Sequence, residues 1–146
     1  TIKQPKRTPM KVLKLLAIPF LLAGCVITDD GIALNPTSTS GLRLFEAVTD
    51  DEAQGMKTQI KVESFDHNRL TKAQNSSKNR CFQSHHVLVI MSAMSFEDNT
   101  LEIAKFFYNR TENEQDYELC VDALTFSISK DELRAYIAAM NRLLLF

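Results

Sequence analysis

The chain has 146 residues, of which 45% are hydrophobic and 24% are charged, and its formal net charge is −1. This length fits one small domain. The chain contains four glycines, which are not clustered, and this excludes a glycine-rich loop that would cradle a phosphate.

The most specific feature of the sequence lies close to its start. After Met10, the basic residues Lys11 and Lys14 lead into ten uncharged, mostly apolar residues, 15–24. Such a run has the length of a signal peptide and about half the length of a membrane span. The residues that end it, Leu22-Ala23-Gly24-Cys25, resemble the lipobox of bacterial lipoproteins, in which two small residues precede an obligatory cysteine.

The lipobox resemblance covers residues 10–25 and implies an anchor. In that family the cysteine thiol receives a diacylglycerol, and the chain is cut before the cysteine. Residues 1–24 are therefore expected to be a signal peptide, with 1–9 a possible upstream extension, and Cys25 is expected to be the lipidated first residue of the mature chain. Two or more acyl chains, such as palmitate, anchor a protein stably. The alternative is that Cys25 is an ordinary small residue that ends a hydrophobic segment.

The residue after Cys25 bears on localisation, because lipoproteins with Asp at that position are commonly retained in the inner membrane. Here Val26 follows, so we expect the outer membrane, with the domain facing the periplasm. Removal of 1–24 leaves 12 Lys and Arg against 18 Asp and Glu, a formal charge of −6. General nucleic-acid binding requires a basic surface, so no nucleic-acid partner is expected.

Lipidation of Cys25 leaves two cysteines, Cys81 and Cys120. An even number of cysteines in an exported protein predicts a disulfide. The alternative is a pair of free thiols in a protein that is kept reduced.

The mature chain is expected to contain a tether and one globular domain. Residues 25–41 comprise the lipidated cysteine and a polar segment rich in helix breakers, which predicts a flexible tether. The globular domain is expected over 42–146. Within it, 42–48 are ordered with an ambiguous period, 56–63 alternate as in a half-buried strand, and 66–80 resemble a long loop.

Three further strands and a helix are predicted in the rest of the domain. The apolar run 87–91 predicts a central strand. Residues 99–109 fit either a helix that starts with a capping box or a strand, and the β-branched and aromatic residues favour the strand. Residues 117–128 form the last strand, and Ser129 with Glu132 begins a C-terminal helix. The expected fold is α+β, a small antiparallel sheet of about four strands with that helix packed on one face.

No motif for catalysis or metal binding accompanies these elements. His85 and His86 adjoin a predicted strand, where neighbouring side chains point to opposite faces, and no CxxC or HExxH motif supports them. No GxSxG motif is present, and the acidic runs 50–52 and 112–118 are typical of solvated surface. We therefore expect no metal, no cofactor and no enzymatic activity.

Basic residues concentrate in the predicted loop 66–80: Arg69, Lys72, Lys78 and Arg80. They are candidates for a docking site for an acidic partner or lipid headgroups, and the alternative is a solvated loop. The layout of lipobox, tether and small domain with one cysteine pair is similar to that of secretion-system pilotins. The resemblance implies an accessory factor that binds another envelope protein. The alternative function is an inhibitor or immunity-type lipoprotein that neutralises a hydrolase or toxin.

Overall fold

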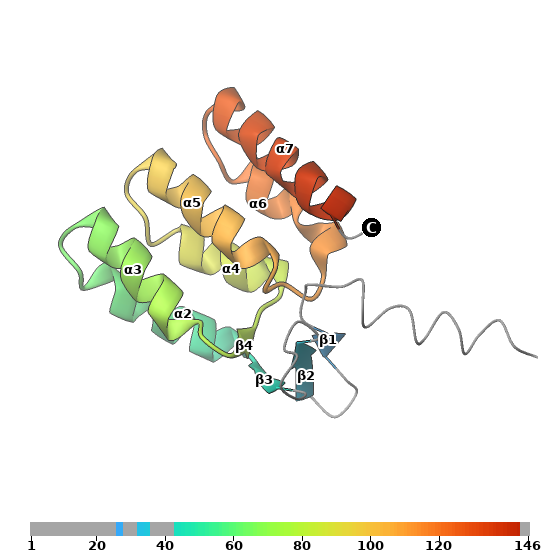
Figure 1. Cartoon of the computed structure of the whole chain (residues 1–146). Coiled ribbons are helices and arrows are strands. Elements are labelled where there is room, and N and C mark those ends of the chain that lie inside the picture. The colour runs from blue at the N-terminus through green and yellow to red at the C-terminus, as the bar shows by residue number, and fades with distance from the viewer. Residues whose placement is uncertain (1–25, 28–31, 36–42, 144–146) are drawn as a thin grey trace, which may run out of the picture.

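The structure, a computed structural model, describes residues 26–27, 32–35 and 43–143 (Figure 1). Within these ranges the chain forms six α-helices, one 3-10 turn and four short strands. The helices are α2 (Asp50–Lys61), α3 (Asp66–Ser76), α4 (Ser84–Met91), α5 (Glu97–Tyr108), α6 (Glu118–Asp122) and α7 (Ser127–Leu143), and the turn η1 is Glu114–Asp116. The strands are β1 (Val26–Ile27), β2 (Ile32–Asn35), β3 (Arg43–Ala47) and β4 (Arg80–Cys81).

The helices form three consecutive hairpins, α2 with α3, α4 with α5 and α6 with α7, which stack side by side (Figure 1). The first helices of the hairpins, α2, α4 and α6, pack against one another in one layer, and the second helices, α3, α5 and α7, pack in the other. Each hairpin thus packs on its neighbour, as in helical repeat proteins.

The sequence repeats with the hairpins. Ser64-Phe65, Ser95-Phe96 and Thr125-Phe126 directly precede the second helix of each hairpin. The three phenylalanines are 31 and 30 residues apart. A period of this size is typical of helical hairpin repeats, in which each unit buries its apolar face only against its neighbours.

Local signals fix where α2 and α4 begin. Thr49 accepts a hydrogen bond from the backbone N–H of Glu52 (3.3 Å), and the Glu52 carboxylate accepts one from the Thr49 N–H (2.8 Å), which forms a capping box. At the start of α4 the Gln83 N–H donates to His86 Nδ1 (3.2 Å), and the His86 N–H donates to the Gln83 backbone carbonyl (2.9 Å). These caps satisfy N–H groups that the first helical turn leaves without partners.

The core lies between the two helical layers, and all of its residues fall between Val48 and Leu133. Its largest fully buried side chains include Phe82, Phe107, Tyr108 and Tyr117. Phe82 meets Phe107 edge to face with ring centroids 4.7 Å apart, and Tyr108 meets Tyr117 at 5.0 Å. Such aromatic pairs contribute roughly 0.5–1.5 kcal/mol each beyond the area that they bury.

The strands form one small sheet in the order β1-β2-β3-β4. The first two pairings are antiparallel, whereas β3 and β4 are parallel. The sheet lies at one end of the helical stack (Figure 1).

The predicted α+β fold is wrong, because the domain is mostly helical. Residues predicted as strands lie in α2, α4, α5 and α6. Met56 packs on the core and Ile60 lies within it, while Thr58 and Val62 are exposed. The buried residues of this segment are therefore four positions apart, as in a helix, and over a few residues this pattern resembles the alternation of a strand. The run 87–91 is short, and a short apolar run does not distinguish a buried helix from a strand.

The C-terminal helix is confirmed as α7, but it begins at Ser127 rather than at the predicted Ser129, which is buried within the helix. It packs on α5 and α6 rather than on a sheet. The predicted loop 66–80 contains α3, and part of the segment predicted as tether forms β1 and β2.

The predicted signal peptide, 1–24, and Cys25 lie outside the described residues. Among the helices that the structure describes, none combines the length and the apolar character needed to cross a membrane.

Candidate functional site

Five large hydrophobic side chains are exposed at or near the turns that join the two helices of each hairpin. Phe65, Phe96 and Phe126 occupy the same position in successive hairpins and are 72%, 67% and 61% exposed. Val62 is 76% exposed and Ile128 is 77% exposed, and these two lie at the first and third of these turns. We name these five residues the loop edge.

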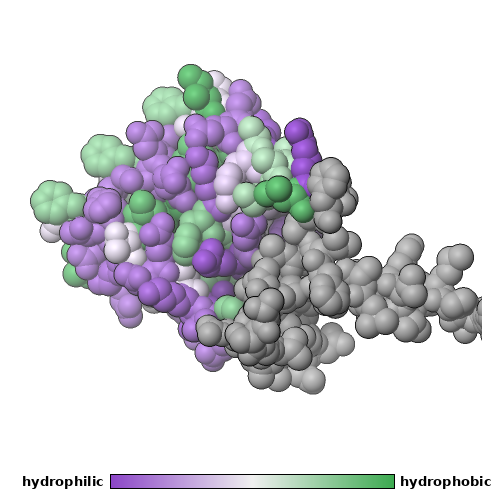
Figure 2. All heavy atoms as spheres, viewed as in Figure 1, coloured by the Kyte–Doolittle hydropathy of each residue, from purple (hydrophilic) through white to green (hydrophobic). Residues whose placement is uncertain are grey.

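Figure 2 shows hydrophobic side chains that protrude one after another along the side where these turns lie in Figure 1. Single exposed apolar residues are common on protein surfaces, and hydrophilic side chains lie between these hydrophobic ones in Figure 2. What distinguishes the three phenylalanines is that each is exposed at the same position of its hairpin. The repeated phenylalanine therefore marks the loop edge as the candidate functional site.

The backbone beneath Phe96 is held by Asp66, the first residue of α3. Its carboxylate accepts hydrogen bonds from the N–H groups of Ser95 (2.9 Å) and Phe96 (2.8 Å). Arg69 donates to the same carboxylate at 3.1 Å and to the Ser95 hydroxyl at 2.7 Å. The Asp66 side chain is only 4% exposed, so one buried carboxylate joins the first hairpin to the second.

The electrostatics of Asp66 favour its charged form. Burial alone would raise the pKa of this carboxyl group, but the N–H groups of Phe96 and Ser95, with Asn99 and Arg69, outweigh burial and hold it below 3.8. The junction therefore contains a carboxylate at neutral pH.

Glu97, the first residue of α5, makes the same connection one hairpin further along. Its Oε1 atom accepts hydrogen bonds from the N–H groups of Thr125 (2.7 Å) and Phe126 (3.0 Å). In the first two hairpins an acidic residue thus directly follows the phenylalanine, and its carboxylate accepts a hydrogen bond from the backbone N–H of the phenylalanine in the next hairpin. In the third hairpin Ser127 follows the phenylalanine instead. These bonds fix the backbone from which Phe96 and Phe126 project.

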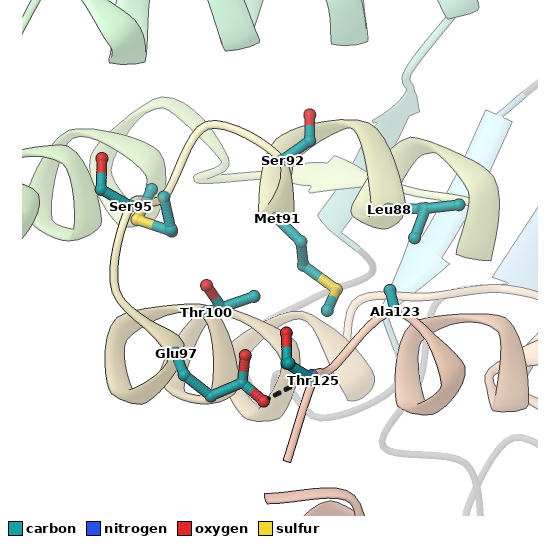
Figure 3. Close-up of a pocket in the computed structure, with 9 residues that line it drawn as sticks. Leu88, Met91, Ser92, Ser95, Glu97, Thr100, Ala123 and Thr125 are labelled. Atoms are coloured by element: carbon teal, nitrogen blue, oxygen red, sulfur yellow. Dashed lines mark hydrogen bonds between the residues drawn. The ribbon is translucent and has the colours of Figure 1, made fainter.

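A cavity of about 310 Å³ opens between the second and third hairpins, beside the loop edge (Figure 3). Figure 3 shows Met91 of α4 directed toward Ala123 and Thr125, and the hydrogen bond from Thr125 to Glu97 lies at the same site. This volume is at the small end of the range for ligand sites. The cavity is lined by Leu88, Met91, Ser92, Met94, Ser95, Glu97, Thr100, Ala123 and Thr125.

His85 and His86 converge on Asp50, contrary to the expectation that they would diverge. Both lie in the first turn of α4, and the Nε2 atom of each is 2.8 Å from Asp50 Oδ1. The Gln83 N–H donates to His86 Nδ1 (3.2 Å), so Nδ1 is unprotonated and the neutral ring carries its proton on Nε2. Burial lowers the pKa of His86 below 6.5, although the hydrogen bond to Asp50 opposes that shift.

The three ligand atoms of Asp50, His85 and His86 lie within 4.8 Å of one another, which is close enough for a metal site. A metal on His86 Nε2 would require a proton on Nδ1, and the Gln83 N–H already occupies that side of the ring. The cluster instead joins the start of α2 to the start of α4.

The four basic residues predicted to bind a partner do not lie in one loop. Arg69 and Lys72 belong to α3, Lys78 to the turn that follows, and Arg80 to β4. Arg69 contacts Asp66 at 3.1 Å, Lys72 contacts Glu63 at 2.9 Å, and Arg80 contacts Glu52 at 2.8 Å, while Lys78 is exposed. Three of the four therefore form ion pairs within the domain, and their role in docking stays a prediction.

The predicted disulfide between Cys81 and Cys120 is wrong, because the Cys120 thiol is free and buried. Cys120 lies in α6 rather than in a strand, and its Sγ atom donates to the Ser84 carbonyl at 3.5 Å. Burial raises the pKa of this thiol to about 12. Cys81 is buried in β4, at the end of the small sheet.

The loop edge was not among the residues predicted from the sequence. The signal that identifies it is the recurrence of Ser-Phe or Thr-Phe at spacings of 31 and 30 residues. Nothing in the local composition around any single phenylalanine indicates that it is exposed.

Residues 47–137 match a family described as a domain of unknown function, DUF4476. The matched span includes all of α2 to α6 and most of α7, and therefore the three hairpins. No curated protein and no solved structure matches the chain.

Proposed function

The chain belongs to the DUF4476 family, and we propose that it is a non-enzymatic, membrane-anchored envelope lipoprotein that binds another envelope protein through the loop edge. The observation that carries this proposal is the row of Phe65, Phe96 and Phe126, each more than 60% exposed. Leaving a phenylalanine in water forgoes roughly 1.5–3 kcal/mol of burial free energy. Three at equivalent positions indicate a surface that a partner covers.

The architecture supports a binding role, because stacked helical hairpins present extended surfaces to which partners bind. Asp66 and Glu97 fix the backbone beneath Phe96 and Phe126, so the side chains project from an ordered edge. Binding to an edge that is already ordered costs less conformational entropy than binding to flexible loops, which would have to become ordered.

The lipobox resemblance supports the anchor and the location. Lipidation at Cys25 would hold the domain at the outer membrane, where we place it facing the periplasm. Confinement to a membrane raises the effective concentration of a partner on the same membrane. The layout that resembles pilotins no longer includes a bond between Cys81 and Cys120, because the Cys120 thiol is free. The resemblance therefore supports an accessory role through the lipobox and the small domain only.

Affinity capture from membranes tests the binding site. The native chain, the triple variant F65S/F96S/F126S and the control Leu119→Ser serve as baits, because Leu119 is 51% exposed on α6 and is not part of the loop edge. We expect the native chain and the control to capture the same envelope protein, and the triple variant to capture at least tenfold less. Equal capture by all three baits would overturn the proposed site. Capture of a hydrolase or toxin would support the inhibitor role instead.

The anchor is tested separately by palmitate labelling and membrane fractionation of the native chain and Cys25→Ser. We expect the native chain to be labelled and to fractionate with the outer membrane, and the variant to lose both properties. Label or membrane retention in Cys25→Ser would contradict the proposed lipidation site.

A further inference from the structure

We propose that the loop edge binds an amphipathic helix of the partner, whose apolar residues recur every seven positions with Lys or Arg beside them. This proposal rests on the proposed function, because it specifies the shape and charge of the protein that the loop edge binds. It follows from the spacing of the phenylalanines, the cavity beside them and the charge of the domain.

The spacing is set by the stacking of the hairpins. Phe65, Phe96 and Phe126 precede α3, α5 and α7, which pack side by side, and packed helices lie about 8–10 Å apart. A helix rises about 10.5 Å over seven residues, so its successive heptads match successive hairpins. An extended strand places the side chains of one face about 7 Å apart. Successive side chains of a strand would therefore not match phenylalanines that are about 8–10 Å apart.

The cavity provides a place for one large anchor residue of that helix. It lies between the second and third hairpins, and its lining includes Ser95, Glu97 and Thr125, the chain neighbours of Phe96 and Phe126. Met91 and Met94 also line it, and methionine side chains adapt to irregular apolar groups. The cavity is also lined by polar residues, among them Ser92, Glu97 and Thr125. A side chain with an apolar stem and a polar or basic end, between two heptad contacts, fits this position.

Charge favours basic residues on the partner. Exposed carboxylates on Asp98, Asp122 and Asp131 lie in the elements that flank Phe96 and Phe126. The nearby cations are Lys130, Arg134, which contacts Asp131 at 3.7 Å, and Arg69, which is paired with Asp66. The chain from Cys25 onward has 12 Lys and Arg against 18 Asp and Glu. Such a domain attracts a basic helix and is repelled by an anionic bilayer.

The size of the loop edge argues against a second copy of this chain as its occupant. Three phenylalanines exposed by about two thirds offer roughly 100–170 Å² each. Even with Val62 and Ile128, the edge offers less than the approximately 800 Å² per partner that a standard stable interface buries. A single helix of about 18 residues matches this smaller surface.

A designed peptide tests the geometry. The probe is a fluorescent 21-residue helical peptide with Leu at heptad positions and Lys beside them, and the reference peptide has the same composition in scrambled order. The protein is the chain from position 25 with Cys25→Ser, which retains every core residue between Val48 and Leu133. We expect fluorescence anisotropy to show at least tenfold tighter binding of the heptad peptide.

Variants of the protein locate the contact. We expect Phe65→Ser, Phe96→Ser and Phe126→Ser each to weaken peptide binding at least fivefold, and Leu119→Ser to change it less than twofold. Circular dichroism confirms that each variant remains helical. Replacing the peptide Lys residues by Glu is expected to weaken binding at low salt, and an equal or higher affinity would overturn the charge assignment.

Three outcomes would overturn the helix proposal. They are equal binding of heptad and scrambled peptides, equal losses in Leu119→Ser and the Phe variants, and Phe-dependent binding to vesicles of phosphatidylethanolamine and phosphatidylglycerol without peptide binding. If the triple variant loses envelope-protein capture while neither peptide binds, only the helix geometry fails. If capture does not depend on the phenylalanines, the proposed function itself fails.

Discussion

Replacing Asp66 by alanine tests whether the hairpins are joined by buried carboxylates. The side chain is 4% exposed and accepts hydrogen bonds from two backbone N–H groups at 2.8 and 2.9 Å and from Arg69 at 3.1 Å. Its removal leaves these donors without their acceptor and leaves the Arg69 charge partly buried. We expect Asp66→Ala to lower the free energy of unfolding by about 3–5 kcal/mol.

Urea denaturation followed by circular dichroism measures this loss. Asp66→Asn retains an oxygen acceptor without the charge and is expected to lose about 1–2 kcal/mol. The control Asp122→Ala removes an exposed carboxylate at the end of α6 and is expected to stay within about 0.5 kcal/mol of the native chain. Because the first hairpin packs on the second through this junction, Asp66→Ala can also divide the unfolding into two transitions.

The pH dependence gives an independent check on Asp66. The pKa of this carboxyl group is held below 3.8 in the folded chain, so its stabilising effect is fully present above pH 3.8 and is lost as the pH falls toward the folded pKa. The stability gap between the native chain and Asp66→Asn should therefore narrow in that range. A gap that is constant with pH, or equal stability of Asp66→Ala and Asp122→Ala, would refute the reasoning.

Three further predictions follow from buried groups. Burial lowers the pKa of His86 below 6.5, so as the pH falls the unfolded chain takes up the proton at a higher pH than the folded chain does. The free energy of unfolding should therefore decrease as the pH drops below 6.5, and it should depend less on pH in His86→Gln. Tyr117→Phe removes a hydrogen bond of 2.6 Å to the Ala104 carbonyl and should lower urea stability by about 1 kcal/mol; no loss would contradict this. Burial raises the pKa of Cys120 to about 12, so this thiol should react with Ellman's reagent only in urea, and Cys120→Ala identifies its signal.

The sequence predicts some elements well because their signals are long. The apolar stripe over α7 extends for several turns, so its period is unambiguous, and the helix is observed. The start of α2 has a clear capping box at Thr49 and Glu52, although the strand-like alternation after Met56 obscured it. Over seven residues the helical and strand periods share several positions, and tertiary packing decides between them.

The α5 segment shows a different difficulty. Thr100 and the aromatic residues after it have β propensity, yet Leu101, Ala104, Phe107 and Tyr108 are buried at helical spacing against α3, α4 and α7. Burial between helices outweighs an intrinsic preference of a few tenths of a kcal/mol.

The candidate site depends on long-range order that no single window contains. Phe65, Phe96 and Phe126 become a row only because the hairpins stack in register, and a comparison of the sequence with itself at a 30-residue offset is the signal that reveals it. The meeting of Asp50 with His85 and His86 likewise depends on α2 packing against α4.

Site-specific photocrosslinking in cells tests the central claim most directly, that the loop edge is the surface that a partner covers. A photoreactive phenylalanine analogue is placed at position 65, 96 or 126, or at the control position 119, in the full-length chain. We expect the same envelope protein to crosslink from all three phenylalanine positions and not from 119. Crosslinks from 119 alone, or no crosslink at 65, 96 and 126 while the partner is still captured, would contradict it.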